Sequence, residues 1–216
     1  LKTAAPREFP FTERDFERIA KRLYDEAGID MPRSKEPLVY SRLAKRIRQL
    51  GLSSFADYIR RVEDPEAEEI EHLLVALTTN VTRFFREPHH FDDLRERVMP
   101  ILAETARRRG RVRMWSAGCS SGEEPYSMAL TVLEAFPEAR SADLKILATD
   151  INTKVVKHAR AGIYPRKALE TAAPALVAAW FEPEEPDALR ASDALKQLIA
   201  FRTLNLMGDW PMKGQF

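Results

Sequence analysis

The sequence predicts an α/β protein with an all-helical N-terminal domain, and three observations support this fold class. Residues 1–77 show only helical periodicity, residues 111–162 alternate strand, helix, strand and helix, and about three strand candidates lie between residues 111 and 216. Such alternation indicates a parallel sheet with crossover helices. Because an open doubly wound sheet normally has five or more strands, we expect this α/β domain to be incomplete.

The N-terminal region is predicted to contain four helices. The first, in "TERDFERIAKRLYDEAG", has Thr12 and Asp15 as a capping box and Gly28 as its C-terminal stop. In the fourth, which extends to residue 77, Asp64 is the cap and Pro65 the first helical residue. The second and third helices are expected in residues 40–51 and 53–62.

A further amphipathic helix is expected in "PHHFDDLRERVMPILAETARRRG", ending at Gly110. Its buried stripe is predicted to consist of Phe91, Leu94, Val98 and Leu102. The α/β region then has strands in residues 111–116, 144–150 and 198–207 and helices in residues 124–136 and 152–162. Residues 164–193 are rich in Ala, Pro and Glu without a clear period, so we interpret them as an insertion or a small helical excursion.

Composition excludes several classes of protein. Lys plus Arg (34) nearly balances Asp plus Glu (33), so no overall positive field indicates nucleic-acid binding. The sequence has no membrane-length apolar run and no apolar signal-peptide core, so we expect a cytoplasmic protein without direct membrane insertion. The single cysteine excludes an internal disulfide, and the adjacent His89 and His90 diverge on a helix, so no metal site is expected.

Basic residues concentrate between Ser34 and Arg61, a segment that contains seven basic residues and only two acidic residues. A local excess in a nearly neutral chain predicts a docking face for an acidic partner, although a charged helix face can also simply be solvated. The candidate docking residues are Arg42, Lys45, Arg46 and Arg48.

The stretch "MWSAGCSSGEEPY" combines a strand, a glycine turn and a helix start, where an α/β domain ordinarily binds a nucleotide. Glu123 and Glu124 occupy the positive helix end, and no Lys or Arg lies between Trp115 and Ala139, so a phosphate would meet uncompensated negative charge. S-adenosylmethionine fits better, because it carries a sulfonium and an ammonium and no phosphate. Asp150, at the end of the second strand, is placed to accept hydrogen bonds from its ribose. Alternatively, the two glutamates only complement the helix dipole.

The letters "GCSSG" also match the G-x-S-x-G nucleophile elbow of esterases, with Ser120, Asp150 and His158 in the order of a hydrolase triad. The context disfavours this alternative. The elbow follows several strands, whereas only helices are expected before residue 111, and His158 falls inside an expected helix. The glutamates after the turn would also oppose a developing oxyanion.

A second polar stretch, "TTNVTRFFRE", joins the helical region to the α/β region. In it the polar Asn80, Thr82 and Arg86 are interleaved with the aromatic Phe84 and Phe85. The aromatic residues could be no more than an interdomain plug, with the polar ones forming a turn and a cap. Three polar groups at a domain junction, where clefts form, favour a binding site instead.

Together the two stretches resemble the CheR family of chemotaxis receptor methyltransferases. Family patterns are matched by "TTNVTRFFRE", by "SAGCSSGEEPYS" with Ser121 in place of Thr, and in order by "ATDI", "ARAGIYP" and "LNL". The resemblance implies a helical receptor-docking domain in residues 1–77, and a linker with the first helix of the catalytic domain in residues 78–110. Residues 111–216 then form a Rossmann-like S-adenosylmethionine-dependent methyltransferase domain, incomplete, with a small inserted β subdomain at about 165–203.

By the same resemblance we expect methyl transfer from S-adenosylmethionine to glutamate side chains of chemotaxis receptors, leaving S-adenosylhomocysteine. The expected partners are the cytoplasmic helices of those receptors, to whose membrane arrays a monomeric protein is recruited. Asp150 is expected on the ribose, and Arg86, as the catalytic residue, near the reacting methyl. The implied cofactor residues are Asn80, Thr82, Arg86, Ala117, Glu123, Asp150, Asn205 and Leu206. The alternative is a non-catalytic domain that binds the cofactor or its product as a sensor or scaffold.

Two departures from the family pattern carry their own expectations. The family continues after "KGQF" into another strand and an "NVxIYF" type segment, whereas this chain ends at Phe216, so we expect a truncated fragment that does not turn over. Members that bind a receptor's C-terminal pentapeptide have a glycine-containing loop in the β subdomain. No glycine lies between Tyr164 and Met207, which predicts a protein of the pentapeptide-independent kind.

Overall fold

The computed structural model describes residues 7–78 and 81–214. The chain divides into two compact units, Leu1–Thr79 with Asn205–Asp209, and Asn80–Leu204 with Trp210–Phe216. Within the described ranges, none of the helices combines the length and the apolar character that a bilayer span requires.

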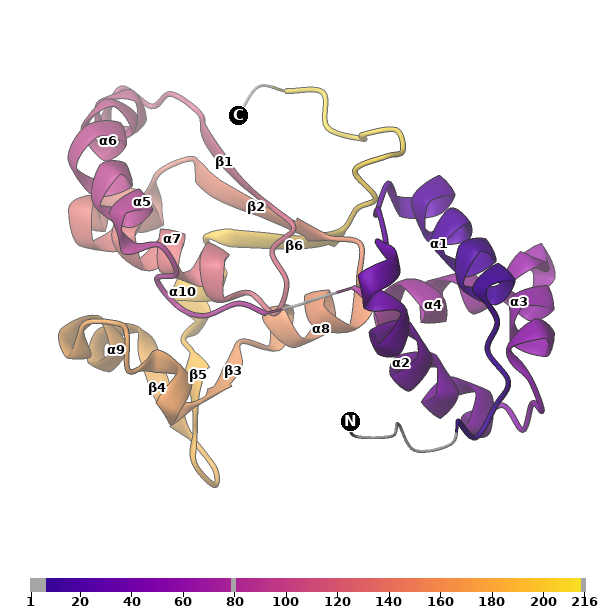
Figure 1. The fold of residues 1–216 in the computed structure, drawn as a ribbon. Helices are drawn as coiled ribbons and strands as arrows, with labels where there is room; N and C mark the ends of the chain where they lie inside the picture. The colour runs from indigo at the N-terminus through magenta and orange to yellow at the C-terminus, as the bar shows by residue number, and fades with distance from the viewer. Residues whose placement is uncertain (1–6, 79–80, 215–216) are drawn as a thin grey trace. The chain divides into compact units, whose positions relative to one another are not determined.

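The first unit is built from helices (Figure 1). Thr12 Oγ1 accepts the N–H of Asp15 at 3.1 Å and the Asp15 carboxylate accepts the N–H of Thr12 at 2.9 Å, which confirms the predicted capping box. Gly28 ends the first helix in the left-handed conformation, as predicted. The elements are α1 (Glu13–Ala27), η1 (Arg33–Lys35), α2 (Glu36–Gln49), α3 (Phe55–Glu63), η2 (Pro65–Ala67) and α4 (Glu69–Leu77).

The fourth predicted helix is wrong at its start. Asp64 caps the chain as predicted, but the segment after it is only the short 3-10 turn that begins at Pro65. Glu68 then takes a left-handed φ of 51°, which interrupts the helix, so that α4 begins at Glu69. The Glu69 side chain is 2% exposed and accepts hydrogen bonds from Arg46 at 2.8 and 2.9 Å. This buried ion pair joins the first turn of α4 to α2.

The second unit contains a three-stranded parallel sheet with strand order β1-β2-β6 (Figure 1). Both crossovers step in the same direction, so right-handed connections place α7 and α8 on the same face of the sheet. Ligands of such sheets bind beyond the carboxyl ends of the strands, here next to Ala117 and Asp150. The elements around the sheet are β1 (Val112–Ala117), α7 (Glu123–Ala135), η4 (Pro137–Ser141), β2 (Leu144–Asp150), α8 (Thr153–Ala161), α10 (Asp193–Lys196) and β6 (Ile199–Thr203).

The long helix predicted before the sheet is interrupted by a π-helical turn. It consists of α5 (Pro88–Asp93), η3 (Leu94–Val98) and α6 (Met99–Arg107), and so ends before Gly110. Because a π turn contains an extra residue, the buried face beyond it shifts by one position from the predicted stripe. Val98 is 37% exposed, so the predicted stripe is wrong there. The residues buried beyond the turn are Met99, Ala103 and Ala106.

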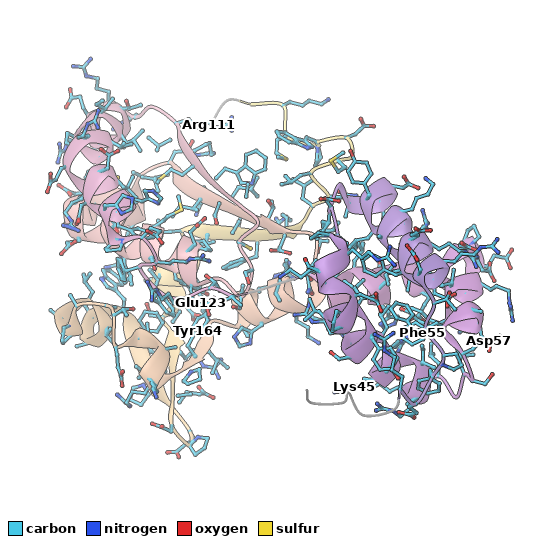
Figure 2. All side chains as sticks on the ribbon, in the orientation of Figure 1. Lys45, Phe55, Asp57, Arg111, Glu123 and Tyr164 are labelled. Atoms are coloured by element: carbon cyan, nitrogen blue, oxygen red, sulfur yellow. The ribbon has the colours of Figure 1, made fainter. Side chains whose placement is uncertain are left out.

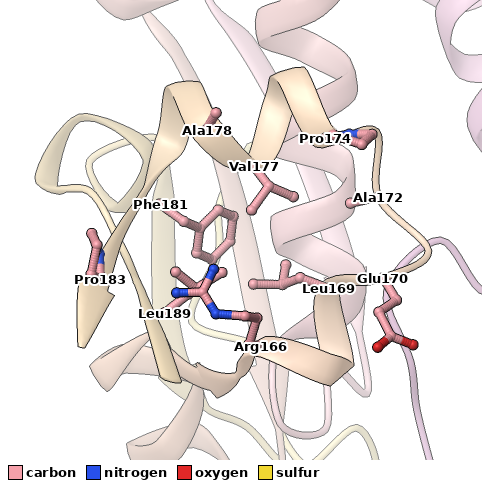
Figure 3. Close-up of a pocket in the computed structure, with 10 residues that line it drawn as sticks. All are labelled: Arg166, Leu169, Glu170, Ala172, Pro174, Val177, Ala178, Phe181, Pro183 and Leu189. Carbon is pink, nitrogen blue, oxygen red and sulfur yellow. The ribbon is translucent and has the colours of Figure 1, made fainter. Parts of the chain in front are cut away.

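The residues between α8 and β6 form a small β subdomain. Of the two alternatives predicted for this segment, the insertion is confirmed and the helical excursion is wrong, and the β subdomain implied by the resemblance is confirmed. Its antiparallel sheet has the order β3-β5-β4. Its elements are β3 (Ile163–Pro165), η5 (Arg166–Leu169), α9 (Pro174–Trp180), β4 (Phe181–Glu184) and β5 (Ala188–Ala191). This subdomain contains a cavity of about 630 Å³, whose lining is apolar apart from Arg166 and Glu170 (Figure 3). None of the predicted cofactor residues lines it.

Candidate active site at the carboxyl end of the parallel sheet

The turn between β1 and α7 has a backbone that favours glycine. Gly118, Ser120 and Gly122 have φ angles of 78°, 49° and 102°. A Cβ on Gly122 would lie 2.6 Å from the hydroxyl of Tyr164 and 2.7 Å from the Cβ of Ala159, so a side chain does not fit. A Cβ on Gly118 would meet nothing within 4 Å among the described residues, so the turn is open to a ligand on that side.

Asp150 ties this turn to the end of β2. One oxygen of its carboxylate accepts the N–H of Ser120 at 2.8 Å, and the other accepts the N–H of Asn152 at 2.9 Å. Asp150 is 8% exposed, so these charge-assisted bonds form in largely buried surroundings. Each carboxylate oxygen has further acceptor capacity, which suits a ribose hydroxyl. The Ser120 hydroxyl is buried without a partner among the described residues, so the turn holds one more unused polar group.

The two glutamates at the start of α7 each accept a hydrogen bond from a serine hydroxyl. Ser121 donates to Glu123 and Ser116 donates to Glu124, both at 2.6 Å. Glu123 is half-buried, whereas Glu124 is exposed. The hydroxyl of Tyr164 donates to the carbonyl of Ser121 at 2.7 Å, which brings the subdomain against this turn (Glu123 and Tyr164 are labelled in Figure 2). Two carboxylates near a third, that of Asp150, favour a cationic ligand.

Cys119 lies in the same turn but is not activated. It is 1% exposed, and burial, together with the nearby Asp150 carboxylate, raises the pKa of its thiol to about 12. The thiol is therefore protonated at neutral pH and unsuited to nucleophilic attack.

The esterase alternative finds no support in this geometry. The hydroxyl of Ser120 has no hydrogen-bond partner in the described part of the chain, and the carboxylate of Asp150 binds backbone N–H groups. His158 is exposed on α8, where its ring packs on Tyr164 at 5.4 Å. A triad requires hydrogen bonds from serine to histidine and from histidine to aspartate.

The loop before α5 holds the candidate catalytic arginine. Arg86 is exposed, and its Nη1 donates to the carbonyl of Val81 at 2.9 Å. Phe84 is fully buried in the core of the α/β unit, so the plug expected for the aromatic pair lies within this unit. Phe85 takes a left-handed φ of 51°, and Thr82 is half-buried. The loop is thus anchored on one side and exposes the guanidinium on the other.

The predicted cofactor residues do not all lie in the same part of the structure. Ala117, Glu123 and Asp150 meet at the carboxyl end of β1 and β2. Asn205 and Leu206 follow β6 and belong to the helical unit, where the Asn205 side chain donates to the carbonyl of Glu26 at 2.7 Å. Asn80 lies outside the described residues. The predicted roles of all eight residues in cofactor binding stay predictions.

The four predicted docking residues of α2 differ in their surroundings. Arg42 donates to the carbonyls of Ala76 and Thr78, and Arg46 binds the buried Glu69, which raises the pKa of its guanidinium. Both therefore hold the helical unit together. The other two are exposed: Arg48 pairs with Glu8 at 2.9 Å, and Lys45 (labelled in Figure 2) makes no ion pair within the described ranges.

An open glycine turn, a buried carboxylate with spare acceptor sites and acidic surroundings suit S-adenosylmethionine better than a dinucleotide. With a parallel α/β sheet, these features fit a domain that binds this cofactor beyond the carboxyl ends of its strands. The chain belongs to the CheR methyltransferase family. Residues 80–216 match its domain described as "CheR methyltransferase, SAM binding domain", and residues 14–78 match its "all-alpha domain".

Curated relatives agree with this assignment. The chain is 50% identical to a "Probable chemotaxis protein methyltransferase" of Rhizobium etli, over 90% of this chain and 74% of the relative. It is 43% identical to "Chemotaxis protein methyltransferase 2" of Pseudomonas aeruginosa, over 96% and 74%. It is 38% identical to the "Chemotaxis protein methyltransferase" of Escherichia coli, over 91% and 67%.

Sequence reasoning missed several residues that build the site. The backbone of Ser120 binds Asp150, and Asn152 both caps α8 and donates to Asp150. Asn152 directly precedes a helical pattern, which is an N-cap signal that could have identified it. Ser127 on α7 accepts a hydrogen bond from the arginine loop, and its identity as a small polar residue in a buried helix face was the available signal.

Proposed function

We propose that the protein methylates glutamate side chains of chemotaxis receptors, with S-adenosylmethionine as the methyl donor. The observation that carries the proposal is the acidic turn, where the Asp150 carboxylate binds the turn backbone and Glu123 begins the next helix. The family match supports the cofactor, and the names of the relatives support methyl transfer in chemotaxis. The glutamate acceptor comes from the resemblance of the motifs to the receptor methyltransferases.

The chemistry requires alignment rather than proton transfer. A glutamate side chain has an ordinary pKa of about 4.3, so it is ionised at neutral pH and needs no general base. When bound, the cofactor supplies a methyl group activated by a sulfonium. A carboxylate oxygen forms a bond to the methyl carbon as the carbon–sulfur bond breaks, and the electron pair stays on sulfur, so the products are an uncharged methyl ester and a thioether. The protein has to hold the carboxylate in line and exclude water.

Each candidate residue has a role that its position allows. Asp150 accepts hydrogen bonds from the ribose with the acceptor sites that its two backbone bonds leave. Glu123 provides negative charge at the start of α7. Arg86 is exposed and bound to its own loop, so its guanidinium can exchange the carbonyl of Val81 for the incoming carboxylate.

Docking on the receptor falls to the helical unit in this proposal. The exposed Lys45 and Arg48 lie on consecutive turns of α2 and can meet acidic residues of a receptor helix. Screening of such exposed charges predicts that receptor affinity falls as ionic strength rises. Replacing both by Glu should raise the KM for receptor, while the same charge change at Arg14 and Lys21, both exposed on α1, should not. Equal effects at the two sites would remove α2 as the docking face.

The decisive experiment is transfer of a radiolabelled methyl group to receptor cytoplasmic fragments by the natural full-length polypeptide. Label released as methanol in alkali identifies a methyl ester. Arg86→Ala should lower kcat by about 100-fold, because an unaligned carboxylate loses most of its proximity advantage. Arg83, an exposed arginine of the same loop, is the matched control, and Arg83→Ala should stay near wild type. Binding of S-adenosylhomocysteine without any receptor labelling would favour the sensor or scaffold alternative.

A further inference from the structure

One buried hydroxyl links the arginine loop to the cofactor helix. Ser127 is fully buried on α7, one turn beyond Glu123. Its Oγ donates to the carbonyl of Glu123 at 2.7 Å and accepts the N–H of Phe85, 42 residues away in the chain, at 2.9 Å. Phe85 directly precedes Arg86, so this hydrogen bond fixes the backbone next to the arginine.

A second hydroxyl holds the same loop from the other side. Thr171, in the inserted subdomain, donates to the carbonyl of Phe84 at 2.9 Å. Phe85 takes a left-handed φ of 51°, a conformation that a bulky residue keeps only when its surroundings hold it. The two hydroxyls bind the C=O and the N–H of one peptide group, which joins Phe84 to Phe85, and so fix the orientation of the peptide plane that precedes Phe85.

Ser127 differs from an ordinary buried helix hydroxyl. Thr131, one turn further along α7 and equally buried, donates to the carbonyl of Ser127 at 2.9 Å and makes no hydrogen bond to the arginine loop among those that the structure describes. Such a bond to the carbonyl four residues earlier satisfies the hydroxyl locally. Ser127 makes the equivalent bond to Glu123 and in addition binds a separate segment.

We infer that Ser127 is a positioning residue that aligns Arg86 with the cofactor helix, and Thr171 supports it from the inserted subdomain. The inference rests on the proposed role of Arg86 in receptor methylation. Without the Ser127 hydroxyl, the N–H of Phe85 loses its partner, and the loop can turn Arg86 away from the reacting methyl. Cofactor binding should change little, because Asp150 and the glycine turn do not involve this hydroxyl.

The test compares Ser127→Ala with Thr131→Ala in the natural full-length polypeptide. Ser127→Ala should lower kcat about tenfold, which corresponds to one lost hydrogen bond of about 1.4 kcal/mol. Its affinity for S-adenosylhomocysteine should stay within about threefold of wild type. Thr131→Ala should leave kcat and the affinity for S-adenosylhomocysteine near their wild-type values, even where it lowers thermal stability. Amide exchange at Phe85 should accelerate in Ser127→Ala alone.

A double-mutant cycle tests whether Ser127 acts through Arg86. In the Arg86→Ala background, Ser127→Ala should have little further effect on kcat. Equal kcat losses in Ser127→Ala and Thr131→Ala, or additive losses of Ser127→Ala and Arg86→Ala, would overturn the inference. Where Ser127→Ala does not fold, Thr171→Val loosens the same loop and should lower kcat in the same direction, and an unchanged kcat would be equally decisive.

Failure of the proposed function can be distinguished from failure of the inference about Ser127. If the wild-type protein methylates no receptor glutamate, that function is lost while amide exchange at Phe85 still reports on the Ser127 contact. If exchange at Phe85 is the same in wild type and Ser127→Ala, the contact itself is absent.

Discussion

Replacing Asp150 by Asn tests the centre of the site, because the change keeps the shape of the side chain and alters its hydrogen bonding. The carboxylate accepts two backbone N–H groups, from Ser120 and Asn152. A carboxamide offers only one oxygen, so its nitrogen, which is a donor, must face one of the two N–H donors. One hydrogen bond is lost, and the other becomes a bond between uncharged groups.

The expected cost follows from these two changes. A hydrogen bond to a charged group contributes roughly 1.5–3 kcal/mol, against about 1 kcal/mol for an uncharged pair. Asp150→Asn should therefore lower the free energy of unfolding of the α/β unit by about 2–5 kcal/mol. Asp143, which directly precedes β2, is the matched control: its side chain is 55% exposed and pairs with Arg113 at 2.6 Å. Asp143→Asn should cost less than about 1 kcal/mol.

Tryptophan fluorescence during urea unfolding measures this cost in the relevant unit. All three tryptophans, Trp115, Trp180 and Trp210, belong to the α/β unit, so their signal follows its unfolding. Calorimetric titration with S-adenosylhomocysteine, which we expect to bind near 1 µM, should show affinity at least tenfold weaker in Asp150→Asn. Equal unfolding midpoints for Asp150→Asn and Asp143→Asn would refute the hydrogen-bond argument. Unchanged cofactor affinity would refute the ribose role.

Three further predictions concern neighbouring residues. Met99→Ala should destabilise the α/β unit by about 2–5 kcal/mol and Val98→Ala by less than about 1 kcal/mol, as measured by urea unfolding, and the reverse order would contradict the π-turn register. Glu123→Gln should weaken S-adenosylhomocysteine binding about tenfold and Glu124→Gln less than about twofold in calorimetry, whereas equal effects would favour simple dipole complementation. Burial raises the pKa of the Cys119 thiol to about 12, so iodoacetamide at pH 8 should label it only after unfolding. Because the unfolded thiol ionises first, stability should fall as pH rises above about 8.5, and labelling of the native protein would contradict this reasoning.

Local signals predicted those elements whose ends are determined by nearby residues. The capping box of Thr12 and Asp15 and the stop at Gly28 were predicted because caps act within one turn of the chain. The start of α2 was placed too late, because Pro37, which fits the first turn of a helix, was overlooked. Strand β2 was predicted with its observed bounds, since a short apolar run that begins after Asp143 and ends at Asp150 has the length of a buried strand.

Tertiary interactions determined the elements that sequence reasoning missed. The break before α4 depends on Glu68, whose side chain gives no sign of a left-handed backbone, and on the partner that Arg46 provides to Glu69. The π turn moves burial from Val98 to Met99, and both residues are apolar, so hydrophobic pattern alone does not separate them. The strands of the inserted subdomain are three to four residues long, too short to establish a period of two.

The backbone of the turn explains why acid and glycine occur together there. A phosphate-binding turn offers its free N–H groups to the ligand. Here four of these groups already donate within the protein, those of Gly118, Cys119, Ser120 and Gly122. The carbonyl of Thr149 accepts two of them, and the carboxylate of Asp150 accepts the N–H of Ser120. These bonds leave fewer donors for an anion, while the carboxylate that holds the turn retains acceptor sites for hydroxyl groups. The arrangement therefore favours a cationic nucleoside over a pyrophosphate, and glycine serves the sharp backbone path rather than phosphate contact.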